Sequence, residues 1–162
     1  MLVKAGLEAL YHSSSQYQRL LSHNGGYDTL TSLLEEKEPL DWIGKLEDLP
    51  TSEYYINENG QKIFLSHAGY SFWADEPKPK IKDKDLLWDR LHFYDSANLL
   101  SSIVVVHGHT PIRHLAREIN TAPLYGALKY ANGKKYCIDA GTFFTNRSIL
   151  FNLDTFKSII IK

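Results

Sequence analysis

The spacing of apolar residues changes about a third of the way along the chain, from a helical period to the patterns typical of strands. Apolar residues three and four positions apart predict helices before the change. Three segments have this spacing: Met1–Tyr11, Thr29–Glu36 and Pro39–Leu49. The third begins with a proline in its first turn and is followed by Pro50, which are the usual start and stop signals of a helix.

After Pro50 the pattern predicts strands. Tyr54–Ile56 and Lys62–Leu65 flank Asn59-Gly60, and an Asn-Gly pair between two such segments is typical of a β-hairpin. Four consecutive β-branched residues, Ile103 to Val106, indicate a strand that is buried on both faces.

The remaining segments complete the predicted organisation. Trp73 to Asp85 contains two prolines and several lysines, which predicts a loop. Three further segments predict strands, which we expect to be antiparallel: 135–139, 148–153 and 156–161. Asp154-Thr155 is the expected turn between the last two. The order of elements predicts an α/β protein in which N-terminal helices are followed by mixed or antiparallel strands.

Composition limits the function more than the fold. With 162 residues, of which 43% are apolar, the chain is expected to form a single domain over residues 1–162. A formal net charge of -1 gives no electrostatic reason to bind nucleic acid or a membrane surface. The single Cys137 excludes a disulfide framework within the chain and a multi-cysteine zinc site. No signal peptide or membrane-spanning segment is evident, so we expect a cytoplasmic protein.

Two histidines lie just beyond predicted strands. His67 follows the strand that ends at Leu65, and His109 follows the strand that ends at Val106. Imidazole is a good ligand for borderline metals, and the end of a buried strand holds it on a rigid backbone. If these strands are neighbours, both rings point at one ion. Arg90 lies between them in the sequence, and its guanidinium fits phosphate oxygens. Metal and arginine together favour phosphoryl chemistry.

Each of these residues also has a structural interpretation. A histidine after a strand is often a hydrogen-bonding loop residue, and Arg90 would then be a surface arginine paired with Asp89 or Glu118. His107 can point into the core or toward the site, and we interpret it as structural. Asp139 is a candidate carboxylate behind the metal ligands or a turn residue. The other histidines have no distinguishing context: His12, His23, His92 and His114.

Five motifs occur in the order of a known family. They are Asn24-Gly25-Gly26, Phe64-Leu65-Ser66-His67-Ala68-Gly69, Leu87-Trp88-Asp89-Arg90, Val106-His107-Gly108-His109-Thr110-Pro111 and Ile138-Asp139-Ala140-Gly141. This series resembles the C-terminal half of the phosphoprotein phosphatase family of calcineurin-like metallophosphoesterases, and it is most similar to the bacterial and phage branch that includes lambda phosphatase. The resemblance spans nearly the whole chain.

The resemblance implies a four-layer αββα fold in which two mixed sheets are flanked by helices. It also implies two divalent metal ions per complete site, manganese with iron or zinc. By motif, His67 and His109 match the two histidine ligands of the second metal, and Arg90 matches the arginine that holds the substrate phosphate. The implied substrates are phosphoproteins or other phosphomonoesters.

The upstream motifs of that family are absent from this sequence: Gly-Asp-x-His-Gly, Gly-Asp-x-x-Asp-Arg-Gly and Gly-Asn-His-Glu. In relatives they supply the ligands of the first metal, the bridging aspartate, the asparagine ligand and the general acid, so we assign no catalytic residue here. Met1 to Lys4 resembles the helix start that follows Gly-Asn-His-Glu. We therefore expect an N-terminally truncated domain with little activity alone, and self-association through exposed sheet surface, including the flank of the Ile103–Val106 strand.

Three functions remain open at this point. The first is a serine/threonine protein phosphatase, realised in an intact protein. The second is a symmetrical diadenosine tetraphosphate hydrolase, whose histidine motifs are similar. The third is a non-catalytic remnant that binds a partner, which the absent upstream ligands favour.

Overall fold

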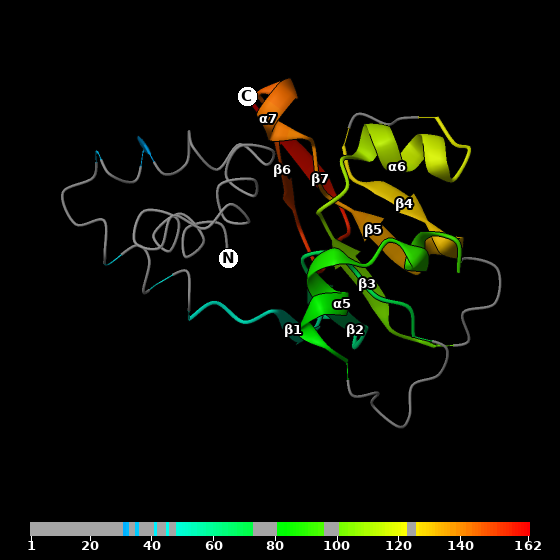
Figure 1. The fold of residues 1–162 in the computed structure, drawn as a ribbon. Helices are drawn as coiled ribbons and strands as arrows, with labels where there is room; N and C mark the ends of the chain where they lie inside the picture. Colours follow the sequence, from blue (N-terminus) through cyan, green and yellow to red (C-terminus); the bar gives the residue numbers. More distant parts are fainter. Residues whose placement is uncertain are drawn as a thin grey trace. The chain divides into compact units, whose positions relative to one another are not determined.

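The computed structural model describes residues 31, 32, 35, 41, 45, 48–72, 81–95, 101–122 and 126–162 (Figure 1). The chain divides into two compact units, Met1–Pro50 and Thr51–Lys162. Most of the first unit lies outside the described residues, so a single domain over the whole chain stays a prediction.

Four of the described positions in the first unit are helical. The N–H of Glu35 donates to the carbonyl of Thr31 over 3.2 Å, the spacing of an α-helical turn. Asp41 and Lys45 are also helical. The second and third expected helices are confirmed at these residues. The expected helix at Met1–Tyr11 lies outside the described residues.

The second unit is built on a five-stranded mixed sheet, with strands in the order β1-β2-β3-β5-β4 (Figure 1). The strands are β1 (Ser52–Ile56), β2 (Lys62–Ser66), β3 (Val104–His107), β4 (Leu128–Tyr130) and β5 (Lys135–Cys137). The three central strands run parallel, and β1 and β4 pair antiparallel at the two edges. We did not predict β4, and β5 is antiparallel to β4 but parallel to β3.

Strand β3 occupies the centre of this sheet. All four of its residues are buried, as the β-branched sequence predicted. The expectation that the flank of this strand is exposed is wrong, because β2 and β5 pair with β3 on both sides. Successive side chains alternate between the faces, so Val104 and Val106 belong to one apolar cluster and Val105 to another.

The β1–β2 hairpin is confirmed, with a longer turn than an Asn-Gly pair alone would make. Gly60 donates its N–H to the carbonyl of Asn57 over 2.9 Å, and its φ is 75°. This is a three-residue loop with glycine in the left-handed region, so Asn59-Gly60 forms its end and not its centre. The Asn57 side chain accepts the N–H groups of Asn59 and Gln61.

Short helices cover one face of the sheet, and a second hairpin covers the other. The helical face has α5 (Asp83–Trp88), the 3-10 helix η1 (Leu91–Phe93) and α6 (Ile112–Glu118). The start of α5 at Asp83 corrects the expectation that the loop continues to Asp85. Leu86, Phe93 and Leu115 anchor these helices in the core.

The second hairpin is a separate two-stranded sheet of β6 (Ser148–Phe151) and β7 (Ser158–Ile161). Its antiparallel pairing and its turn near Asp154-Thr155 are confirmed. Phe156 stacks on Tyr136 of β5, with ring centroids 5.1 Å apart. The described part of this unit also contains two short helices, η2 (Ala131–Gly133) and α7 (Thr142–Thr145).

The described part of the chain therefore contains helices together with a mixed sheet, which confirms the expected α/β class. In this part, no helix is both long enough and apolar enough to cross a membrane.

Candidate functional site

The parallel pairing of β2 and β3 brings the two predicted histidines together. Ser66 and His107 are paired in register at the ends of these strands. The residues that follow therefore leave the sheet at the same edge, where ligands usually bind in such sheets. The N–H of Gly108 donates to the carbonyl of His67 over 2.9 Å, which links the two loops directly.

The imidazole rings of these loops face each other. Nε2 of His67 lies 3.1 Å from Nδ1 of His109, and the ring centroids are 4.9 Å apart. This distance suits an N–H···N hydrogen bond. The structure therefore brings the two histidines together, and their binding of one ion stays a prediction.

Both rings are held in the neutral form that binds metals. Burial lowers the pKa of His67, and the nearby Asp139 carboxylate opposes that shift. Burial, followed by the Arg90 charge, lowers the pKa of His109 to about 4. A neutral imidazole has a lone pair to donate, so neither ring must lose a proton before it coordinates an ion at neutral pH.

The backbone of His109 is strained. Its φ is 65°, in the left-handed region that only glycine adopts without cost. Its Nε2 atom is buried and has no hydrogen-bond partner among the described residues. The Trp88 ring packs edge-on against it, with centroids 5.6 Å apart. A strained backbone and an unpaired buried polar atom in one residue are typical of functional positions.

Arg90 lies beside this pair. Its Nε–H donates to Oγ1 of Thr110, the residue after His109, over 3.1 Å. This contact uses one of the five N–H donors of the guanidinium. The carboxylates suggested as surface partners bind elsewhere: Asp89 accepts the N–H of Leu91, and Glu118 accepts the hydroxyl of Tyr94.

Asp139 has the turn role that the sequence suggested, and its role behind metal ligands stays a prediction. Its Oδ1 accepts the N–H of Gly141 over 2.7 Å, which is a turn contact of the kind that aspartate often makes. Its negative charge also raises the pKa values of His67 and His109, so it lies close enough to act on both.

Two further histidines, His92 and His107, lie beneath the site. The sequence predicted a structural role for His107 and no role for His92. Both His92 and His107 are 1% exposed. Burial lowers the pKa of His92 to about 2 and that of His107 to about 4, so both rings are neutral. No spacing in the sequence singles out His92, because its contacts come from segments far apart in the chain.

One nitrogen of His67 and one of His109 have the spacing of two ligands on a single metal ion. Imidazole nitrogens lie about 2.0–2.1 Å from zinc, so two of them on one ion are roughly 2.9–3.4 Å apart. The His67–His109 distance of 3.1 Å falls in that range. The part of the chain that the structure describes contains no group of three or more histidine, cysteine or carboxylate side chains that would hold a metal. The described residues therefore offer a pair of imidazole nitrogens at this distance, without a third such side chain beside them.

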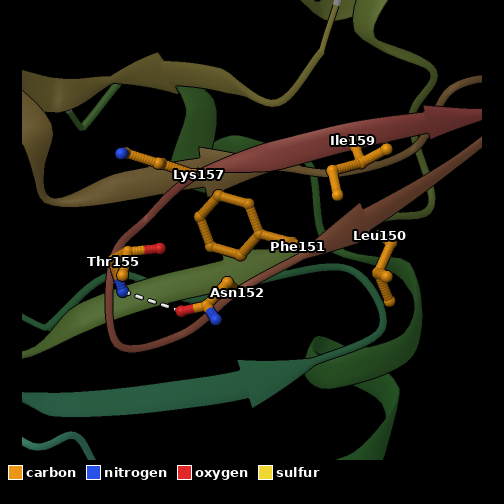
Figure 2. Close-up of a pocket in the computed structure, with 6 residues that line it drawn as sticks. All are labelled: Leu150, Phe151, Asn152, Thr155, Lys157 and Ile159. Carbon is orange, nitrogen blue, oxygen red and sulfur yellow. Dashed lines mark hydrogen bonds between the residues drawn. The ribbon is translucent and has the colours of Figure 1, made fainter.

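The pocket at the β6–β7 hairpin has a different character. It encloses about 400 Å³ and is lined by Leu150, Phe151, Asn152, Thr155, Lys157 and Ile159 (Figure 2). Figure 2 shows Leu150 and Ile159 on neighbouring strands, and Asn152 bonded to the backbone of Thr155. No histidine or carboxylate is among these lining residues, so it lacks the groups that would hold a metal ion.

No protein-family model matches this chain, and no curated protein matches it significantly in sequence.

Proposed function

We propose that His67, His109 and Arg90 form part of a metal-dependent site for hydrolysis of phosphate monoesters. The observation that supports this most is the 3.1 Å distance between the two imidazole nitrogens. Neutral imidazoles at the spacing of a metal chelate, with a guanidinium beside them, are the donors that bind an ion and a phosphate together.

Arg90 and the two histidines would have different roles in this site. Arg90, tethered through Nε to Thr110, has its terminal N–H groups to donate to phosphate oxygens. The two histidines would hold a divalent ion, manganese by resemblance, or iron or zinc. When bound, such an ion polarises the phosphate and provides a hydroxide nucleophile. Asp139 adds negative charge near both rings, which favours a cation there.

More specifically, we propose that the site belongs to a protein phosphatase of the calcineurin-like type, which acts on phosphoserine or phosphothreonine. Its support is the order of the motifs around Ser66-His67, Arg90 and Gly108-His109, and the parallel β2–β3 pair that joins two of them. The complete site would contain two ions, and this chain supplies ligands for one.

Metal-dependent phosphate binding tests this function. We expect inorganic phosphate to bind with Mn²⁺ present and to bind at least about tenfold more weakly with EDTA. Arg90→Gln should weaken the metal-dependent binding by about tenfold, because charge-assisted hydrogen bonds are lost. Arg117→Gln, on the exposed last turn of α6, is the matched control. Phosphate binding that ignores Mn²⁺ and Arg90 contradicts the proposal.

Hydrolysis of p-nitrophenyl phosphate separates the site from the complete enzyme. With Mn²⁺ we expect slow turnover, because two histidines leave most of the coordination shell without protein ligands. Rapid turnover that disappears in both His67→Ala and His109→Ala would support phosphatase chemistry but contradict the expectation that this chain is nearly inactive alone.

A non-catalytic role is favoured by a different observation. Leu150, Ile159 and Ile161 are exposed on one face of the β6–β7 hairpin, and apolar side chains gathered on one face are typical of contact surfaces. Concentration-dependent light scattering that Leu150→Lys and Ile159→Lys reduce, without metal-dependent phosphate binding, would favour this second function.

A further inference from the structure

The peptide group beside each candidate ligand is held by a buried histidine. His92 Nε2 lies 2.6 Å from the carbonyl oxygen of Ala68, the residue after His67. His107 Nδ1 lies 3.0 Å from the carbonyl oxygen of Gly108, the residue before His109. A carbonyl oxygen can only accept, so each ring nitrogen must carry the proton and donate it.

Each of these rings is itself fixed by a second buried donor. The ammonium of Lys135 is 3.4 Å from Nδ1 of His92, and it also contacts Oγ of Ser71 and the carbonyl of His92. An ammonium has three N–H donors, and these three acceptors use them all. Because Nδ1 of His92 accepts from Lys135, the proton of this neutral ring is on Nε2, where Ala68 needs it.

Tyr130 acts on His107 in the corresponding way. Its hydroxyl is 2.7 Å from Nε2 of His107. Since Nδ1 of His107 donates to Gly108, Nε2 of the neutral ring is an acceptor, and Tyr130 must donate. The tautomers of the two histidines are therefore opposite: His92 is protonated at Nε2 and His107 at Nδ1.

The hydrogen bonds of His92 and His107 end on two loops that are also hydrogen-bonded to each other. The N–H of Gly108 binds the carbonyl of His67, and the N–H of Thr110 binds the carbonyl of Gly108 over 2.8 Å. The carbonyl of Gly108 is thus held from both sides next to the strained backbone of His109. Such strain persists only where surrounding contacts over-determine the conformation.

We propose that His92 and His107 are positioning residues, each fixed in one tautomer by Lys135 or Tyr130, and that their bonds to the Ala68 and Gly108 carbonyls set the spacing of His67 and His109. The relevance of this spacing to metal binding rests on the proposed function. The claim that the two bonds set the spacing is independent of that function. Partners that orient ligating groups typically change metal affinity by about 10–100-fold when removed.

The test compares variants that keep or remove the donor. In His92→Gln the side-chain amide nitrogen can replace Nε2, and in His107→Asn it can replace Nδ1, whereas His92→Leu and His107→Leu have no donor. We expect each leucine variant to weaken Zn²⁺ binding by about 10–100-fold and the amide variant at the same position to recover most of it. If these histidines only stabilise the fold, every variant that folds should bind Zn²⁺ with the same affinity.

A metal-free readout makes the inference independent of the proposed function. In the free protein, ¹⁵N NMR should show His92 protonated at Nε2 and His107 at Nδ1, and nuclear Overhauser effects should connect the His67 and His109 rings. Tyr130→Phe, which removes only a hydroxyl, should release the tautomer of His107 and weaken these effects. If the leucine variants do not fold, Tyr130→Phe still tests the arrangement at His107, because it removes only the hydroxyl that fixes the tautomer.

The outcomes are distinct. Loss of the ring contacts in the leucine and Tyr130→Phe variants, with no Zn²⁺ binding by any protein, would support the positioning role and overturn the proposed function. Ring contacts and tautomers that are unchanged in all these variants would overturn the positioning role, whatever the metal affinity.

Discussion

Nε2 of His67 lies 3.1 Å from Nδ1 of His109, although 42 positions separate the two residues in the sequence. The parallel pairing of β2 and β3 produces this contact, because it places the ends of both strands at one edge of the sheet. The segments that follow the two strands are bonded to each other, because the N–H of Gly108 donates to the carbonyl of His67, and this bond limits how far the two rings can separate.

The strained backbone of His109 predicts an unusual ranking of substitutions. We expect His109→Gly to be more stable than His109→Ala by roughly 1 kcal/mol, because only glycine adopts a φ of 65° without cost. At exposed Arg113 in α6 the ranking should reverse, since glycine destabilises a helix interior. Urea unfolding of the four variants measures both differences, and an alanine variant as stable as the glycine variant at position 109 would contradict the strain.

Gly69 supports the site from below, because it leaves room for His92. A Cβ at this glycine would lie 2.5 Å from Cε1 of His92, and its φ is 97°. We expect Gly69→Ala to cost roughly 2–4 kcal/mol, from backbone strain and the steric clash together. Gly60→Ala is the matched control: φ is 75° and nothing lies within 4 Å, so only the backbone cost of about 1 kcal/mol applies.

A double variant separates the two costs at Gly69. In Gly69→Ala with His92→Ala the clash with His92 is gone and only the 3.0 Å approach to Cγ of His107 remains, so the alanine should cost less than in the wild-type background and approach its cost at Gly60. Unfolding by urea gives this coupling, and simple additivity of the two substitutions would mean that His92 does not occupy the space beside Gly69.

Acid should destabilise the chain through its buried histidines. Unfolded histidine takes up a proton near its ordinary pKa of 6.5, whereas burial lowers the pKa of His107 to about 4 and that of His92 to about 2. Between these values the unfolded state binds more protons, so the free energy of unfolding falls as the pH decreases. We expect a loss of roughly 2–5 kcal/mol from about pH 6.5 to pH 4.5.

Urea unfolding at several pH values measures this loss. His92→Gln should reduce the acid dependence by roughly a third, because it removes one histidine with a lowered pKa and leaves His107 and His109. Thr121→Ala, at an exposed position, is the control and should leave the dependence unchanged, because it removes no titratable group. Equal slopes for wild type and His92→Gln would show that His92 is protonated as readily in the folded chain as in the unfolded one.

The sequence was most informative where local pattern and tertiary structure agree. The strand at Val104–His107, the β1–β2 hairpin and the position of the histidines after their strands follow from apolar spacing and turn residues. Strand β4 was missed because it has three residues and no distinctive pattern. The role of His92 was missed because Ala68 and Lys135, its partners, lie far from it in the sequence.

Calorimetric titration with Zn²⁺ tests the central claim most directly. We predict that the wild-type chain binds one ion, and that His67→Ala and His109→Ala each weaken this binding by at least about tenfold, since each removes one of two ligands. His114→Ala, which removes an exposed histidine on α6, should bind as the wild type does. Equal affinity in all four proteins, or a loss that His114→Ala shares, would contradict a metal site formed by His67 and His109.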